Sequence, residues 1–406
     1  MSTSDIIWLL VQVIGSLALF LFGMKYMSEA LQRFAGQGMR NVLASFTSNR
    51  FKSIITGAFV TTVIQSSSAT TVMVVSFVNA GILKLRNAIG VIMGANIGTT
   101  MTAWIITLFG LKFDISAFAI PVIGAGFICM MLNKIKINQV GEFLVGFGIL
   151  FLGLTFLKNT ISDLDLQNSE AVRNIIAACV SDGNAHIGHV LLFLLIGTIL
   201  TTILQSSSAT MALTIVLCSE GVIPLELAVA LVLGENIGTT ITANIAAAIG
   251  NSTAKRAARA HLLFNTIGVL WILVVFRLVM PFINFLTISI EGVSPYVSAA
   301  AVPVALSLFH TLFNIMNTSI LVWFVPQIEK LTSLMVQGSN EEDEVEYRLK
   351  YINTGFMNVG EVSIELAKKE TSSWSSTTQL SLPWLPSLVW IPKTSWTMTS
   401  RMQSRT

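Results

Sequence analysis

A hexapeptide rich in amide and hydroxyl side chains occurs twice in this chain, letter for letter. Residues 65–70 read Gln-Ser-Ser-Ser-Ala-Thr, and residues 205–210 read the same. A hydroxyl both donates and accepts hydrogen bonds, and an amide does so through separate atoms. Each copy can therefore offer donors to an oxyanion and oxygen atoms to a dehydrated alkali cation.

A second polar motif follows each hexapeptide at the same distance. Residues 94–100 read Gly-Ala-Asn-Ile-Gly-Thr-Thr and residues 234–240 read Gly-Glu-Asn-Ile-Gly-Thr-Thr, so a single offset aligns both motifs. The most faithfully repeated letters are polar, whereas a duplication kept for core packing would repeat apolar positions at least as well. The alternative is that these side chains only bond helix backbones, as small polar residues do in membranes. We predict a binding site made of Gln65, Ser66, Ser67, Ser68, Thr70, Asn96, Thr99, Gln205, Ser206, Ser207, Ser208, Thr210, Asn236 and Thr239.

Glu235 departs from the repeat, because the first copy has Ala95 at the matching position. A carboxylate within an apolar span is costly and by default marks a functional site. Glu235 is therefore a candidate for coupling: it could bind a cation, exchange a proton or pair with a positive group. A structural salt bridge or an interfacial position is the alternative.

Two later segments share the pattern His-x-Leu-Phe-Asn, at residues 261–265 and 310–314. The spacing puts His and Asn on one helix face, for helix-to-helix hydrogen bonding or for ligand contact.

An intramembrane hydrolase is disfavoured, because the chain has no Gly-x-Ser-x-Gly elbow and no repeated acid to orient a base. The three cysteines lack metal-ligand spacing. We therefore expect neither an enzyme nor a cofactor.

The composition indicates an integral membrane protein. Hydrophobic residues make up 53% of the chain and charged residues 11%, whereas soluble domains carry about 25% charged residues. No basic patch is interleaved with aromatic residues in the apolar region, so nucleic acid is not an expected partner; a lipid bilayer is.

The apolar runs predict an all-α membrane fold. Each hexapeptide sits between two short apolar arms, which predicts a re-entrant hairpin that enters and leaves on one side; such backbone needs protein or a water-filled cavity around it. The second polar motif of each half is expected to break a transmembrane helix. The expected elements are a first span at 5–29, a charged loop to residue 52, a hairpin at 53–80, a broken span at 87–109, spans at 116–133 and 140–157, a hairpin at 189–220, a broken span at 227–249, and spans at 260–288 and 298–326.

Positive charge predicts the orientation. With both hairpins re-entrant, twelve Lys and Arg residues fall on the cytoplasmic side and three outside, as the positive-inside rule requires. Repeat 1 (about 5–134) and repeat 2 (about 140–250) are then inverted, the N-terminus is outside and the C-terminus is cytoplasmic. Inverted repeats with broken helices are typical of secondary transporters.

The paired Gln-Ser-Ser-Ser and Gly-x-Asn-Ile-Gly-Thr-Thr segments and the His-x-Leu-Phe-Asn pattern resemble the type II sodium/phosphate cotransporter family, particularly its bacterial members, over about residues 10–326. The resemblance implies symport of inorganic phosphate with sodium as the coupling ion, by alternating access across a bacterial cytoplasmic membrane. It also implies that the two Gln-Ser-Ser-Ser hairpins contact phosphate or sodium, without dividing them between the two. Symport of another oxyanion, sulfate or a carboxylate, and phosphate sensing without transport are the alternatives; the oligomeric state stays open.

The end of the chain differs from the rest. Residues 1–330 form the expected transmembrane domain, and residues 331–370 resemble the start of a cytoplasmic helical region similar to the phosphate-signalling protein PhoU. Residues 371–406 contain no Asp or Glu, sixteen Ser or Thr and four Trp. We expect this atypical tail to be disordered, as a frameshifted, truncated or naturally short end.

Overall fold

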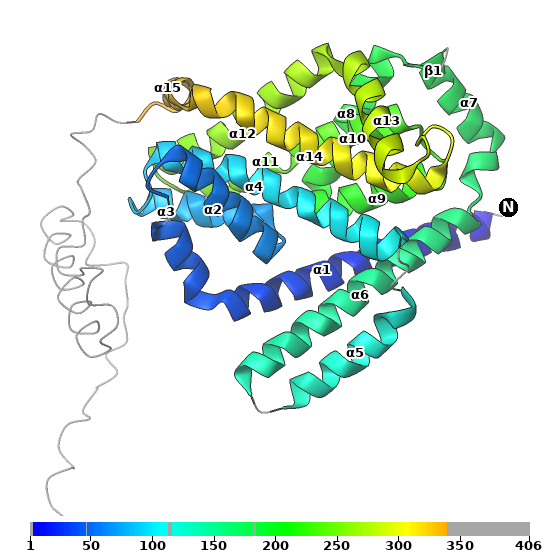
Figure 1. Ribbon diagram of the computed structural model, residues 1–406, viewed down its shortest axis with the longest axis horizontal. Helices are drawn as coiled ribbons and strands as arrows, with labels where there is room; N and C mark the ends of the chain where they lie inside the picture. Colours follow the sequence, from blue (N-terminus) through cyan, green and yellow to red (C-terminus); the bar gives the residue numbers. More distant parts are fainter. Residues whose placement is uncertain (1–2, 46, 113–115, 133, 182–183, 339–406) are drawn as a thin grey trace, which may run out of the picture. The chain divides into compact units, whose positions relative to one another are not determined.

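The computed structural model describes residues 3–45, 47–112, 116–132, 134–181 and 184–338 (Figure 1). These residues are almost entirely helical, apart from one antiparallel pair of two-residue strands, β1 (Val180–Ser181) and β2 (Asn184–Ala185). The all-α prediction is confirmed. Of the predicted PhoU-like region, residues 339–370 lie outside the described residues, as does the whole tail at 371–406.

The first half of the chain forms six α-helices and one π-helical segment. They are α1 (Thr3–Ser45), α2 (Arg50–Ile64), α3 (Ser67–Asn79), α4 (Leu85–Ile105), η1 (Ile106–Lys112), α5 (Ser116–Met131) and α6 (Ile135–Asp163). The predicted loop after residue 29 is wrong, because α1 continues through it to Ser45. Residues 30–45 contain no proline and several good helix formers, and their positive charge does not end a helix.

In the second half, the hairpin helices and the helix with the second polar motif follow in the same order after a short connection. Its elements are η2 (Leu166–Asn168), α7 (Glu170–Cys179), α8 (Ile187–Leu204), α9 (Ser207–Ser219), α10 (Leu225–Gly238), α11 (Thr240–Ala247), α12 (Ser252–Val274), α13 (Phe276–Glu291), η3 (Ala299–Ala301), α14 (Val302–Leu321), η4 (Val322–Phe324) and α15 (Val325–Met335). The single span predicted at 260–288 is instead two helices, which meet at Val275, a residue outside regular helical geometry with φ −99° and ψ 11°.

Seven helical runs of the described chain are long and apolar enough to cross a membrane, which supports a multi-pass membrane protein. One of them is α8 itself. The expectation that every hairpin arm is too short to span is therefore wrong for this arm, because α8 starts earlier in its repeat than α2 does in the first. The seven runs are Ile7–Ala35, Leu85–Lys112, Ile135–Asn168, Ile187–Leu204, Leu225–Ala247, Ser252–Val274 and Ala299–Met335.

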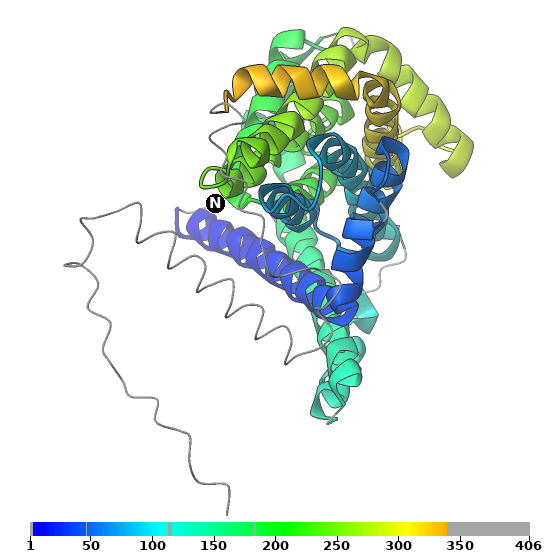
Figure 2. The ribbon, with the colours of Figure 1, turned by 90° about the vertical axis from the view of Figure 1, so that its left-hand side faces the viewer.

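Glycines let each hairpin arm lie directly on the helix that carries its second polar motif. A Cβ atom on Gly57 of α2 would meet the backbone of Val91 in α4, and one on Gly197 of α8 would meet the backbone of Leu231 in α10. The pairs α2 with α4, α8 with α10 and α1 with α6 form some of the most extensive helix contacts of the structure. Figure 2 shows the helices from a second direction.

The two repeats also interlock. Helix α3 of the first hairpin packs against α11 of the second repeat, and α9 of the second hairpin packs against α4 of the first. One buried apolar cluster gathers around α2, α3, α11 and the start of α12, and another around α1, α6, α9 and α10. Helix α12 crosses beside α3, α4 and α10, and α14 beside α4, α9 and α10, so these two helices border both repeats.

Candidate functional site

The tip of the first hairpin is a two-residue turn built by its own polar side chains. Gln65 ends α2 in the left-handed region, with φ 56° and ψ 28°, and its Nε2 donates to the Thr62 carbonyl at 2.5 Å. Ser66 then caps α3, because its Oγ accepts from the Ala69 amide at 3.1 Å. Such a cap satisfies one of the free amides of a helix N-terminus, so the motif ends one helix and starts the next.

The second tip has the same geometry. Gln205 has φ 52° and ψ 28°, and Ser206 accepts from the Ala209 amide at 3.2 Å. Left-handed backbone conformations are uncommon for residues other than glycine. Among the described non-glycine residues, they occur only at these two glutamines and at Asp165. The hexapeptide therefore fixes its local structure in both settings.

Thr70 and Thr210, both predicted site residues, tie the arms of their hairpins together. Thr61 donates to the Thr70 hydroxyl at 3.0 Å, and Thr201 donates to the Thr210 hydroxyl at 2.9 Å. Each acceptor threonine in turn donates to a backbone carbonyl one turn earlier. A hydroxyl has a single hydrogen to donate, so these two groups position the tip and have no donor left for an anion.

The remaining serines of each motif form the first turn of the second hairpin helix, α3 or α9. Ser67 is 7% exposed and Ser208 is 9% exposed, while Ser68 and Ser207 are half-buried. The first intrahelical bond runs from the Thr70 amide to the Ser66 carbonyl, so the earlier amides lack intrahelical partners. Helix N-termini of this kind attract anions through these amides and the helix dipole.

The second motif lies within helices, and the expected break is wrong for the first copy. Helix α4 runs unbroken through residues 94–100, because Asn96 Nδ2 donates to the Ile92 carbonyl at 2.9 Å and Thr99 Oγ1 to the Ala95 carbonyl at 3.0 Å. These polar side chains bond the preceding turn and do not compete with the helix. The amide oxygen of Asn96, which is 5% exposed, is the atom left to ligate a cation.

The second copy keeps the same bonds with only a one-residue interruption. Asn236 Nδ2 donates to the Val232 carbonyl at 2.7 Å, and Thr239 Oγ1 donates to the Glu235 carbonyl at 2.9 Å. Thr239 separates α10 from α11 but stays in right-handed helical conformation. The predicted break is therefore reduced in the second copy to an interruption of one residue.

One hydrogen bond connects the first hairpin tip to α4, the helix that carries the second motif. Thr102 Oγ1 donates to Gln65 Oε1 at 3.0 Å, and Gln65 is 8% exposed. In the second repeat Gln205 is exposed, and the buried hydroxyl of Thr242 has no hydrogen-bond partner within the described chain. Across the described residues, no hydrogen bond joins the predicted site residues of one repeat to those of the other.

Glu235 is the predicted coupling residue, and it lies deep within the protein. It is 1% exposed, and both carboxylate oxygens lack a hydrogen-bond partner in the described part of the protein. Its nearest basic group is His310 Nε2 on α14, at 4.0 Å. The sequence singled out both residues, but their wide separation along the chain concealed that they face each other.

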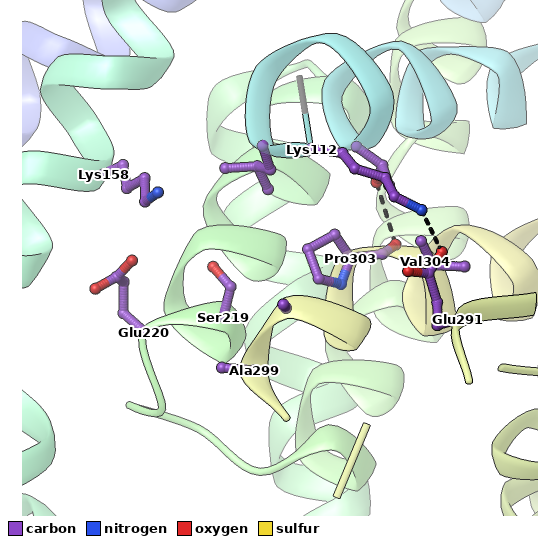
Figure 3. Close-up of a pocket in the computed structure, with 11 residues that line it drawn as sticks. Lys112, Lys158, Ser219, Glu220, Glu291, Ala299, Pro303 and Val304 are labelled. Carbon is purple, nitrogen blue, oxygen red and sulfur yellow. Dashed lines mark hydrogen bonds and ion pairs between the residues drawn. The ribbon is translucent and has the colours of Figure 1, made fainter. Parts of the chain in front are cut away.

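Two cavities lie at the bases of the hairpins and include none of the predicted site residues. One, of about 370 Å³, borders Ser219 and Glu220 at the end of α9; Lys112 closes one side through an ion pair with Glu291 at 2.6 Å, and Lys158 lies on the other side (Figure 3). The other, of about 600 Å³, borders the loop from α3 to α4, with Lys84 and Arg86 in its wall. No group of three or more His, Cys, Asp or Glu suited to a metal occurs in the described chain.

Comparisons with known proteins identify one family model and several relatives. The family model described as Na+/Pi-cotransporter matches residues 19–159 and 166–312. The uncharacterized protein YqeW of Bacillus subtilis is 30% identical over 328 residues, covering 81% of this chain and 98% of YqeW. YjbB of Escherichia coli, named as a candidate inorganic phosphate export protein, is 26% identical over 363 residues, covering 89% of this chain and 62% of YjbB. This chain thus spans less than two thirds of YjbB.

Human sodium-dependent phosphate transport protein 2B is more similar over a shorter stretch. It is 40% identical over 103 residues, which cover 24% of this chain and 15% of the human protein. No solved structure matches the chain.

Proposed function

The chain belongs to the Na+/Pi-cotransporter family, and from this premise we propose that it carries inorganic phosphate across the membrane in symport with sodium. The observation that carries the proposal is the pair of matching hairpin tips. Each presents a helix N-terminus with two further serine hydroxyls in its first turn, at Ser67 and Ser68 and at Ser207 and Ser208. Two such tips supply amide and hydroxyl donors for a tetrahedral oxyanion.

Sodium requires oxygen ligands, because it is a hard cation. The amide oxygens of Asn96 and Asn236 fit this role, since their nitrogens bond the helix and cannot turn toward a ligand at the same time. The side-chain oxygen of Gln205 is a further candidate ligand, because this residue is exposed. We assign phosphate to the serine-capped helix ends and sodium to the amide oxygens nearby.

We further propose that the two repeats are inverted, that both hairpins are re-entrant in the cytoplasmic membrane of a bacterium, and that the N-terminus is outside and the C-terminus inside. Three tertiary ion pairs support this orientation, because each joins two residues that the charge rule places on one side of the membrane. The pairs are Arg33 with Glu142 and Arg86 with Glu329 on the cytoplasmic side, and Lys112 with Glu291 outside.

We propose that transport occurs by alternating access, which is typical of inverted repeats. The first tip holds a buried Gln65 and the second an exposed Gln205, so the two equivalent turns differ in access within one structure. We propose that transport exchanges these environments, with the cavity beside Glu220 leading outside and the one beside Lys84 leading to the cytoplasm.

Phosphate export is the second candidate function. YjbB, whose name states phosphate export, aligns over 89% of this chain, whereas the sodium-dependent human protein aligns over 24%. Symport of another oxyanion, such as sulfate, is a further alternative. Competition of that anion with phosphate for transport distinguishes it from phosphate symport and phosphate export.

The test is uptake of radiolabelled phosphate into proteoliposomes with an inward sodium gradient or an equal potassium gradient. We expect accumulation only with sodium, and its loss in Ser67→Ala and Ser207→Ala. Ser76→Ala is the matched control, because Ser76 lies on α3 but is exposed and bonds only its own helix. Phosphate movement independent of sodium, or driven outward from loaded vesicles, would favour export; no phosphate movement by a folded protein would refute both.

A further inference from the structure

The surroundings of Glu235 do not satisfy its carboxylate. Neither of its oxygens accepts a hydrogen bond in the described chain, and the residue is 1% exposed. A buried carboxylate is strongly destabilising unless a hydrogen bond, a counter-charge or a metal ion compensates it. No lysine or arginine of the described part lies within ion-pair distance of it.

His310 does not supply that compensation. A charge-assisted bond between imidazole and carboxylate closes to about 2.7–2.9 Å, but Nε2 of His310 stays 4.0 Å from Glu235 Oε1. The second ring nitrogen, Nδ1, is buried without a partner in the described chain as well. The pair is therefore adjacent without being bonded.

Two of the helices that contact α10, namely α12 and α14, carry further buried oxygens without donors in the described part of the protein. Asn314, one turn after His310 on α14, uses its amide nitrogen on the His310 carbonyl, and its Oδ1 has no partner. Asn265 on α12 repeats this arrangement with the carbonyl of His261. Both asparagines are fully buried. Unpartnered oxygens on helices that contact one another are the ligand type that a hard monovalent cation requires.

We propose that Glu235 is the anionic ligand of a second monovalent-cation site, which binds sodium beside His310 and is separate from the hairpin tips. The matching residue of the first repeat, Ala95, is buried and has no ligand atom, so the site exists once per chain. It rests on the proposed function, because sodium bound at this place is a co-transported ion. Asn314 is the candidate neutral ligand, since it lies on the same face of α14 as His310.

The experiment compares the wild type with Glu235→Gln, which keeps the size of the side chain and removes its charge. Labelled sodium and labelled phosphate are counted in the same proteoliposomes across a sodium titration. We expect the sodium concentration for half-maximal uptake to rise at least about tenfold, and fewer sodium ions to enter per phosphate. Glu226→Gln is the control, because Glu226 is a buried acid of the same helix, 7% exposed, without a proposed role.

A binding measurement separates this proposal from the transport function. Purified protein is heated in sodium or in choline without phosphate, and sodium should raise the unfolding temperature of the wild type and of Glu226→Gln more than that of Glu235→Gln. Unchanged sodium dependence and an unchanged ion ratio in Glu235→Gln would overturn the site, as would a changed pH dependence alone, which indicates a carboxyl that carries a proton. If phosphate uptake by the wild type does not depend on sodium but sodium still raises its unfolding temperature, symport is refuted and the sodium site is retained.

Discussion

Thr102 donates a hydrogen bond to Gln65 across the first repeat, while the equivalent pair of the second repeat, Thr242 and Gln205, is not bonded. The two glutamines have nearly the same backbone angles, so the difference does not lie in the backbone of the turns. Gln65 is buried at its tip, whereas Gln205 is exposed at the equivalent tip. The proposed alternating access would require such an asymmetry between two equivalent tips.

Valine at position 102 should destabilise the protein, and valine at position 242 should not. Thr102→Val leaves the buried Gln65 oxygen without its donor, which costs about 1–3 kcal/mol. Thr242→Val removes a buried hydroxyl that already lacks a partner in the described chain, so its effect should be near zero or stabilising. Denaturant or thermal unfolding in detergent measures both; equal losses in the two variants would show that the Gln65 bond contributes nothing specific.

Removing the threonine bond between the hairpin arms should affect stability more than phosphate affinity. We expect Thr70→Val and Thr210→Val each to lower the free energy of unfolding by about 1 kcal/mol, because each loses one buried hydroxyl pair. The KM for phosphate should stay within about threefold of the wild type, because both hydroxyls donate to backbone carbonyls and have no donor left for the anion. A large increase in KM with unchanged stability would instead place these hydroxyls on the ligand.

Alanine at the helix contacts of the hairpins should disrupt packing. A methyl group on Gly57 or Gly197 meets the backbone of the opposite helix, and such overpacking costs typically about 1–3 kcal/mol. Gly15→Ala is the control: nothing lies within 4 Å of the added atom, and alanine favours a helix over glycine by about 1 kcal/mol. Unfolding measurements should show two destabilised variants and one unchanged or stabilised variant; tolerance of all three would contradict the close helix approach.

Labelling of introduced cysteines tests the proposed topology. In a background without the native cysteines, a membrane-impermeant maleimide should reach Ile82→Cys only from the cytoplasmic side and Glu220→Cys only from outside. Ile82 is 57% exposed and Glu220 borders a cavity, so both positions are accessible. The two positions follow equivalent hairpins, so opposite labelling is the signature of inversion. Labelling of both from one side would refute inverted repeats.

The sequence alone was sufficient for the family, the all-helical class and the repeat, and it failed where helix continuity was at stake. It predicted breaks at Asn96 and Asn236, but both amides bond the carbonyl one turn earlier and leave the helix nearly or wholly intact. It also ended the first helix near residue 29, although α1 continues to Ser45. Polar or charged residues break a helix only when their side chains have no hydrogen-bond partner in the preceding turn. The sequence does not show whether such a partner is used.

The sequence by itself determined the hairpin tips. Ser66 and Ser206 cap their helices through bonds to residues within the same hexapeptide, so the same six letters fold the same way twice. The tertiary structure alone decided that Gln65 is buried against Thr102 and Gln205 is not, and that Glu235 faces His310 without a bond. These relations join residues far apart in the chain, and the packing of whole helices sets them, which no local pattern encodes.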